Sequence, residues 1–406
     1  MRRLLALVLL AALAAVPAAG ARPDGPAADP GVTATSVKLG ATMPLTGPAV
    51  LFGALGPGAN AYFQHVNSTG GVNGRKIDFV IRDDAYEPAR TVTETRRLVQ
   101  EDQVFAMFAS VGTANNLAVR PLLNALKVPQ LFVGDGSSAL SGDPKRYPWT
   151  IGYLPSYVGE GAMYGRNIKR TKPKARIAVL AEASPLGNDL LTGLRRGLGR
   201  SGAKVVAVQK HDPAAVDVAS QIASLRASRA DTLMLFTTPL FFIRGAIAVN
   251  KLGWRPQLFI NSVSIEPSVM RTAAASAPRT VRDAISMVWL KDPTNTRWAS
   301  DRGVRLYKQL MARYCQGCRV GDVYHYAGMA FAFTMVDALR KAGRNLTRAS
   351  LLRAATNLRE SNNPFLLPGV SVQTTPTSHF PISKAQLYRY RGGRWQPFSG
   401  LLGAKG

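Results

Sequence analysis

The sequence has 406 residues, of which 46% are hydrophobic and 18% are charged, a composition that excludes a disordered or collagen-like chain. The length exceeds what one compact core usually holds, so we expect two lobes. Lysine and arginine number 51 against 24 acidic residues, giving a net charge of +27, and there are only two cysteines and four histidines. This excludes a scaffold stapled by several disulfides and leaves little material for a metal site, so we expect no cofactor.

The first 21 residues predict export from the cytoplasm. Residues 1–3 are basic at two positions, residues 4–16 are apolar, and residues 19–21 (AGA) match a signal-peptidase site. The apolar run is too short to span a bilayer, and no cysteine follows it to carry a lipid anchor. We therefore predict a cleaved signal peptide over residues 1–21, a flexible lead-in over residues 22–35, and a periplasmic or secreted protein.

From residue 37 onward, short apolar runs alternate with amphipathic segments. The first block predicts strands over residues 37–43, 76–81, 104–108 and 130–133, separated by helices over residues 53–66, 90–101 and 115–126. Strands and helices that alternate in this way are typical of a parallel, doubly wound sheet. Residues 150–156, apolar and interrupted by proline, then predict a crossover to a second lobe.

The second block repeats the pattern. It predicts strands over residues 176–181, 205–209, 232–236 and 257–260, separated by helices over residues 186–201, 220–229 and 241–252. After a strand near residues 284–290 we expect helices over residues 298–314, 324–342 and 347–355, and short strands over residues 369–372 and 386–390. The periodicity therefore indicates two α/β lobes with a cleft between them.

Several local motifs favour structural rather than chemical roles. Residues 56–61 (GPGANA) match G-x-G-x-x-A, but the nearest strand ends a dozen residues earlier, which argues against a dinucleotide site. Asp83 and Asp84 are adjacent on extended chain and point to opposite faces, so we interpret them as loop caps rather than an acid/base pair. The sequence holds neither a phosphate-binding loop nor a G-x-S-x-G nucleophile motif.

The cysteines and the basic excess are also interpreted as structural. Cys315 and Cys318 follow a predicted helix, so in an oxidising compartment we predict a small loop disulfide. Residues 166–176 carry six lysines and arginines without interleaved aromatics, which argues against a nucleic-acid partner and favours a solvated surface. A basic surface would also raise the association rate of an anionic ligand.

A series of short motifs, each weak alone, is specific in its order and spacing. It includes residues 43–48 (MPLTGP), 67–75 (NSTGGVNGR), 83–84 (DD), 109–113 (ASVGT), 136–138 (GSS), 252–254 (LGW), 291–293 (KDP) and 367–370 (LPGV). The series resembles type I periplasmic binding proteins, in the leucine/isoleucine/valine-binding branch that serves ABC importers.

The resemblance implies two Rossmann-like, doubly wound lobes joined by three crossovers and closing over a small molecule. We assign residues 36–153 plus 288–366 to the N-terminal lobe and residues 154–287 plus 367–406 to the C-terminal lobe. The resemblance also implies a binding protein rather than an enzyme, a monomer that delivers its ligand to an ABC permease.

The resemblance further implies nine ligand-binding positions. In the first lobe, hydroxyls and backbone N–H groups at helix starts would hold a ligand carboxylate, and an aromatic ring would pack on the ligand. In the second lobe, three positions depart from the amino-acid binders, which carry an aromatic residue, a tyrosine and a carboxylate there. The nine positions are Gly112, Thr113, Gly136, Ser137, Ser138 and Phe52 in the first lobe, and Leu186, Thr238 and Ser262 in the second.

These departures predict the ligand class. A buried α-ammonium without a counter-charge would cost several kcal/mol, so we expect an amine-free aromatic or aliphatic organic acid rather than a branched-chain amino acid. Three alternatives stay open: a true branched-chain amino acid or amide binder, with Glu160 supplying the missing charge; the ligand-binding component of a sensory system; and an exported enzyme, for which we find no catalytic constellation.

Overall fold

The computed structural model describes residues 29–405, so the predicted signal peptide and residues 22–28 of the predicted lead-in lie outside the described residues. Residues 29–35 of that lead-in, which we expected to be flexible, are described and form hydrogen bonds with the rest of the protein. The carboxylate of Asp29 accepts a hydrogen bond from the backbone N–H of Arg348 (2.6 Å), and the carbonyl of Gly31 accepts one from the N–H of Lys38 (2.8 Å). These contacts fix the segment to the first lobe.

The first lobe is built on a parallel sheet with the strand order β2-β1-β3-β4-β5. Its strands are β1 (Ser36–Met43), β2 (Lys76–Asp83), β3 (Ala106–Phe108), β4 (Gln130–Val133) and β5 (Thr150–Gly152). The connecting helices are η1 (Val50–Ala54), α1 (Leu55–Ser68), α2 (Pro88–Gln100), α3 (Thr113–Ala125) and α4 (Ser138–Ser141).

The second lobe repeats this order as β7-β6-β8-β9-β10 and extends it by two antiparallel strands, β13 and β14. Its strands are β6 (Arg176–Glu182), β7 (Lys204–His211), β8 (Thr232–Phe236), β9 (Gln257–Ile260), β10 (Ile285–Val288), β13 (Lys384–Arg391) and β14 (Arg394–Gly403). Its helices are α5 (Tyr157–Thr171), α6 (Pro185–Leu198), α7 (Ala219–Ala227), α8 (Pro239–Lys251), η2 (Ser262–Ser264), α9 (Pro267–Ser276) and α10 (Pro278–Val281).

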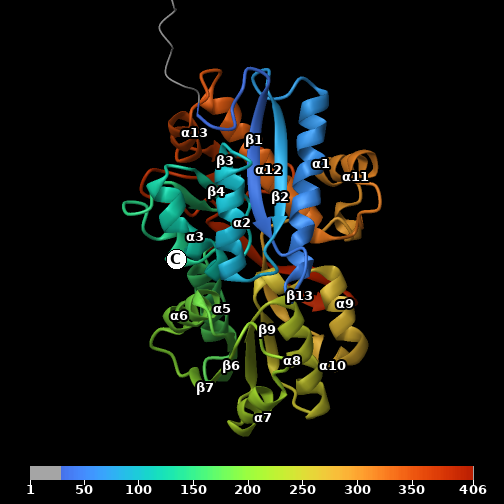
Figure 1. The fold of residues 1–406 in the computed structure, drawn as a ribbon. Coiled ribbons are helices and arrows are strands. Elements are labelled where there is room, and N and C mark those ends of the chain that lie inside the picture. The colour runs from blue at the N-terminus through green and yellow to red at the C-terminus, as the bar shows by residue number, and fades with distance from the viewer. Residues whose placement is uncertain (1–28, 406) are drawn as a thin grey trace, which may run out of the picture.

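After β10 the chain returns to the first lobe, where α12 packs along α1 (Figure 1). This segment holds η3 (Thr296–Trp298), α11 (Arg302–Tyr314), α12 (Val323–Ala342), α13 (Arg348–Ala355), β11 (Arg359–Glu360) and β12 (Val372–Gln373). Gly58 of the G-x-G-x-x-A match allows this packing, because a Cβ there would lie 2.0 Å from the carbonyl oxygen of His325 in α12. The chain thus passes between the lobes after β5, after β10 and before β13, and the predicted fold of two doubly wound lobes is confirmed.

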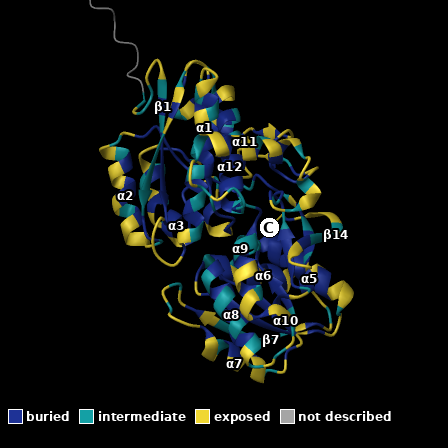
Figure 2. Ribbon diagram, turned by 90° about the vertical axis from the view of Figure 1, so that its right-hand side faces the viewer, coloured by how far each residue is buried: buried dark blue, intermediate teal, exposed yellow. Residues whose placement is uncertain are grey.

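The core explains why these strands form. Strand β8 is buried at all five positions, as expected for a parallel strand that helices cover on both faces. Figure 2 shows the same pattern of burial in both lobes: residues are buried where helices pack on the sheets and exposed on the outer faces of the helices. Among the described residues, no helix has the length and apolar character needed to cross a membrane.

Candidate ligand-binding site

A cavity of about 130 Å³ lies where the two lobes meet. Its polar residues follow the carboxyl ends of strands from both sheets: Thr113 follows β3, Asp135 follows β4, Thr238 follows β8 and Ser262 follows β9. In open α/β sheets the carboxyl ends of the strands, near the point where strand order reverses, are where ligands bind. The cavity therefore occupies the expected place in both lobes.

The structure brings six of the nine predicted positions into the lining of this cavity. They are Phe52, Gly112, Thr113, Leu186, Thr238 and Ser262. The other three, Gly136, Ser137 and Ser138, lie outside the lining. Ser137 caps α4, where its hydroxyl accepts a hydrogen bond from the N–H of Ala139 (3.1 Å).

Ser138 is engaged by the opposite lobe. Its backbone N–H and its hydroxyl both donate to the carboxylate of Asp189 in α6, at 2.6 and 2.7 Å. Because the carboxylate of Asp189 occupies both donors, Ser138 contacts the second lobe and does not face the cavity. The residue predicted to hold a ligand carboxylate thus holds a carboxylate of the protein.

Most of the lining is apolar. It is rich in aromatic rings, contributed by Phe52, Tyr86, Tyr157, Trp289, Trp298, Tyr324, Phe331, Tyr388 and Trp395. An apolar cavity of about 150 Å³ is large enough to admit benzene. The volume and lining of this cavity therefore suit a compact apolar group about the size of one ring.

The start of α3 lies at the edge of the cavity. Gly112, the residue before the helix, has φ +100°, a conformation that favours glycine, and no side chain caps the N–H groups of the first turn. Uncapped N–H groups at a helix start favour a negative charge. The hydroxyl of Thr113, at the same place, donates a short hydrogen bond to the carboxylate of Asp135.

Asp135 is a buried acid that the sequence analysis missed. Its carboxylate also accepts a hydrogen bond from the N–H of Ser137 (2.7 Å), and burial raises its pKa to about 6 despite these hydrogen bonds. Its position directly after β4, in the sequence Gly134-Asp135-Gly136, was the available signal. The hydroxyl of Thr113 is therefore directed to a protein carboxylate.

Glu266 is a second acid in the lining that we did not predict. It caps α9, accepting hydrogen bonds from the N–H groups of Ser268 (2.7 Å) and Val269 (3.1 Å), and burial raises its pKa. Asp135, Glu266 and Asp292 together place three carboxyl groups in the lining, where the sequence analysis expected no counter-charge for an ammonium. The cavity is largely apolar but contains carboxyl groups.

Glu160 does not line the cavity; it supports a residue that does. Its carboxylate accepts hydrogen bonds from the N–H (2.6 Å) and the hydroxyl (2.8 Å) of Ser262 and from the hydroxyl of Tyr164 (2.6 Å). Burial raises the pKa of Glu160 to about 7. The polar groups of Ser262 are thus held from behind by α5.

The adjacent acids Asp83 and Asp84 hold loops, as the sequence analysis predicted. Asp83 accepts hydrogen bonds from the N–H groups of Leu45 and Ala85, both at 2.9 Å. Asp84 accepts one from the N–H of Tyr86 (3.0 Å), whose side chain lines the cavity. The pair therefore shapes the first lobe's edge of the site.

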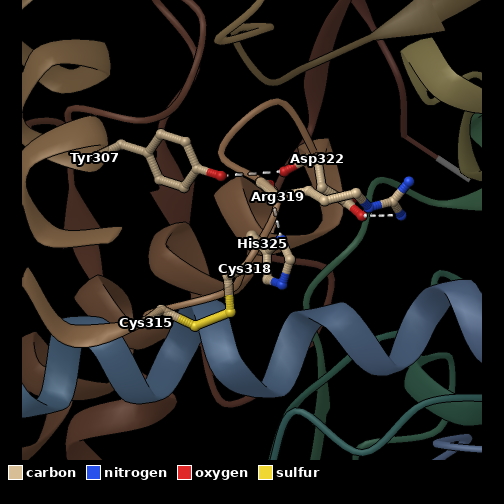
Figure 3. The surroundings of a disulfide bond; sticks show 6 residues. All are labelled: Tyr307, Cys315, Cys318, Arg319, Asp322 and His325. Carbon is tan, nitrogen blue, oxygen red and sulfur yellow. Dashed lines mark hydrogen bonds and ion pairs between the residues drawn. A yellow bond between two sulfur atoms is a disulfide. The ribbon is translucent and has the colours of Figure 1, made fainter. Parts of the chain in front are cut away.

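The two cysteines are joined, as predicted, in the turn between α11 and α12 (Figure 3). Beyond the disulfide, Arg319 pairs with Asp322 at 3.0 Å, and Asp322 caps α12 by accepting from the N–H of Tyr324 (2.9 Å). Because Tyr324 lines the cavity, the bridged turn fixes the start of a helix that contributes to the site.

Comparisons with known proteins agree with this geometry. A family model described as periplasmic binding protein matches residues 36–394. The Leu/Ile/Val-binding protein homolog 7 of Brucella abortus is 23% identical over 321 residues, covering 75% of this chain and 77% of that protein.

Two solved structures share the fold at 20% identity each. A branched-chain amino acid ABC transporter from Thermus thermophilus with bound valine aligns with a TM-score of 0.80 over 91% of this chain and 96% of that one. A fatty acid ABC transporter substrate-binding protein from Thermomonospora curvata aligns with a TM-score of 0.78 over 94% and 95%.

Proposed function

Because this chain belongs to the family of periplasmic binding proteins, we propose that it captures a small, largely apolar organic acid between its lobes and delivers it to an ABC importer. The family binds ligands and works outside the cytoplasm with ABC transporters, without catalysing a reaction. We further propose that the protein is an exported monomer and that its signal peptide ends at residue 21. The lobes would have the boundaries assigned from the sequence, except that residues 367–383, which include β12, belong with the first lobe.

One observation carries the proposed ligand class: an uncapped helix start opens onto a wall of aromatic rings. The ligand carboxylate would lie at the first turn of α3, near Gly112 and Thr113, and its apolar body would pack among the rings. The fatty acid binder from Thermomonospora curvata supports an acid without an amine as a ligand of this fold.

The lining carboxyl groups are compatible with this ligand. Asp135 and Glu266 both already accept hydrogen bonds from the protein, and burial raises the pKa of each. A neutral Asp135 can share its proton with a ligand carboxylate, whereas an ionised Asp135 would repel it. We therefore expect the acid to bind more tightly below about pH 6 than above it.

Asp135 also favours a second candidate, a branched-chain amino acid. An ionised carboxylate in the cavity would pair with the ligand ammonium, and the neighbour from Thermus thermophilus holds valine. The two candidates predict opposite effects for Asp135→Asn. The substitution should strengthen binding of an amine-free acid above pH 6, because it removes a repelling charge, and should abolish binding of an amino acid.

The test is isothermal titration and thermal melting with pairs of ligands that differ only in the amine. Suitable pairs are leucine with 4-methylpentanoate and phenylalanine with 3-phenylpropanoate. We expect the acids to bind and to raise the stability by about 2.7 kcal/mol at a hundredfold excess over Kd. Binding of leucine without binding of 4-methylpentanoate would replace the first candidate by the second.

Variants of the protein locate the site in the same assay. Thr113→Val removes a hydroxyl while keeping the shape. Because the hydrogen bond from Thr113 lowers the pKa of Asp135, its loss should keep Asp135 neutral to higher pH and strengthen binding of the amine-free acid near pH 7. Thr93→Val, at an exposed position of α2, is the matched control. Equal affinities of the two variants would show that the ligand lies elsewhere.

A further inference from the structure

A second and more polar cavity, of about 280 Å³, adjoins the ligand cavity. It lies between the start of α9, the segment that follows β10, and the β13–β14 hairpin. Four residues line both cavities, namely Pro267, Asp292, Asn295 and Trp395. We call this second space the outer cavity, and these four residues are the wall that it shares with the inner one.

The shared wall has a defined shape because it is hydrogen-bonded in place. The indole N–H of Trp395 donates to the carbonyl of Ile265 (3.0 Å), and the side chain of Asn295 donates to the carbonyl of Trp395 (3.1 Å). The Trp395 ring also packs against Tyr390, with 5.3 Å between the ring centroids. A ligand that reached from the inner to the outer cavity would therefore pass residues held in defined positions, of which Pro267 and Trp395 are apolar and Asp292 and Asn295 are polar.

The outer cavity has a net positive charge, because two arginines and one acidic residue line it. Arg271 from α9 and Arg394 from β14 line it, both are exposed, and among the described residues neither forms an ion pair. The acid in its lining is Asp292, whose Oδ1 already accepts hydrogen bonds from the N–H and hydroxyl of Thr294. Arg271 opposes the rise in the pKa of Asp292, so its positive charge acts on this cavity.

The chemistry of these groups selects an anion. A guanidinium presents a planar set of donors that matches a carboxylate or a phosphate. Two unpaired guanidiniums around one cavity exceed the single carboxylate of Asp292, so the local balance favours an incoming negative group. Gly392 and Gly393 in the hairpin turn also line the outer cavity, and nothing lies within 4 Å of a Cβ built on either.

We propose that the outer cavity binds a second anionic group of the ligand, and that the ligand is a dicarboxylic acid with an apolar body rather than a monocarboxylic acid. This inference rests on the proposed function, because the apolar body lies in the inner cavity with the first carboxylate at α3. The second carboxylate extends past Trp395 and Asn295 to Arg271 and Arg394. A small anion that is not part of the ligand could bind to the same two guanidiniums. The experiment below distinguishes binding of such an anion from binding of the ligand's second carboxylate.

The experiment compares pairs of mono- and dicarboxylic acids of equal chain length, such as hexanoate with adipate and octanoate with suberate, by isothermal titration. With the wild-type protein, we expect the diacid of suitable length to bind at least about tenfold more tightly, the lower end of the range for hydrogen bonds to a charged group. Arg271→Gln and Arg394→Gln should each lower this affinity ratio towards one. Arg279→Gln, at an exposed position of the neighbouring α10, is the control and should leave the ratio unchanged.

The outcomes separate the inference from the function on which it rests. If monoacids bind and no diacid binds more tightly, the inference is wrong while the proposed function stands. If no acid of either series binds, the proposed function itself fails. If added acetate or phosphate at constant ionic strength tightens monoacid binding, and Arg271→Gln removes that effect, the outer cavity holds a separate anion and the spanning ligand is refuted.

Discussion

The buried carboxyl group of Glu160 should make the protein less stable as the pH rises towards neutrality. Burial raises its pKa from an ordinary 4.5 to about 7. The folded protein then binds this proton more tightly than the unfolded chain, so the stabilisation is complete below about pH 4.5 and is lost as the pH rises to about 7. A difference of this size corresponds to about 3 kcal/mol of unfolding free energy.

Urea unfolding of the wild-type protein and Glu160→Gln at pH 5, 6, 7 and 8 measures this contribution. Glutamine keeps an oxygen that can accept from Tyr164 and from the N–H of Ser262, but it does not titrate. We expect the stability of Glu160→Gln relative to wild type to rise by about 3 kcal/mol between pH 5 and pH 8. Glu101→Gln, at an exposed position after α2, controls for loss of a negative charge. A pH-independent difference between Glu160→Gln and wild type would refute the reasoning.

Three further changes test other parts of the structure. Gly112→Ala should destabilise the protein by more than about 1 kcal/mol and weaken ligand binding, because a Cβ would lie 2.4 Å from a side-chain oxygen of Asn115 at φ +100°; melting and titration measure both effects. Replacing Cys315 and Cys318 by serine should lower the stability by about 2 kcal/mol, the loop-closure value for so short a loop, and calorimetry of the wild type with reductant should reproduce the loss. Asp189→Asn should weaken ligand binding about fivefold, because it weakens a contact between the lobes worth about 1 kcal/mol; an unchanged Kd would show that this contact does not stabilise the closed form.

The regular elements were predictable where hydrophobic runs are continuous. Strands β4, β8 and β9 have the predicted bounds, because each contains a short apolar run that begins after a polar residue and ends before a polar residue or a glycine. Strand β14 was missed, since Pro397 and Gly400 interrupt its pattern and it lies at the edge of the sheet, where proline is tolerated. The predicted helix over residues 298–314 starts later, at Arg302, because Asp301 caps it.

The site was less predictable, because its polar groups pair with residues distant in sequence. Ser138 is bonded to Asp189, 51 residues away, and Ser262 to Glu160, 102 residues away. Local pattern gives neither partner. The family resemblance assigned Ser138 to the site from the residues next to it in the sequence. In the structure, its hydroxyl instead donates to the carboxylate of Asp189 on the facing helix α6.

The first turn of α12 links the closure of the lobes to the rest of the first lobe. The hydroxyl of Tyr324 donates to the carbonyl of Val263 in the second lobe (2.9 Å), while its ring packs edge-on against Phe52, 5.2 Å between centroids. Asp322, which follows the disulfide in the same turn between α11 and α12, caps this helix. A movement of the second lobe would therefore change the hydrogen bond between Tyr324 and Val263. A less rigid turn before α12 would weaken the same hydrogen bond, because it would let the start of the helix move. The effect of breaking the disulfide should consequently extend from stability to ligand affinity.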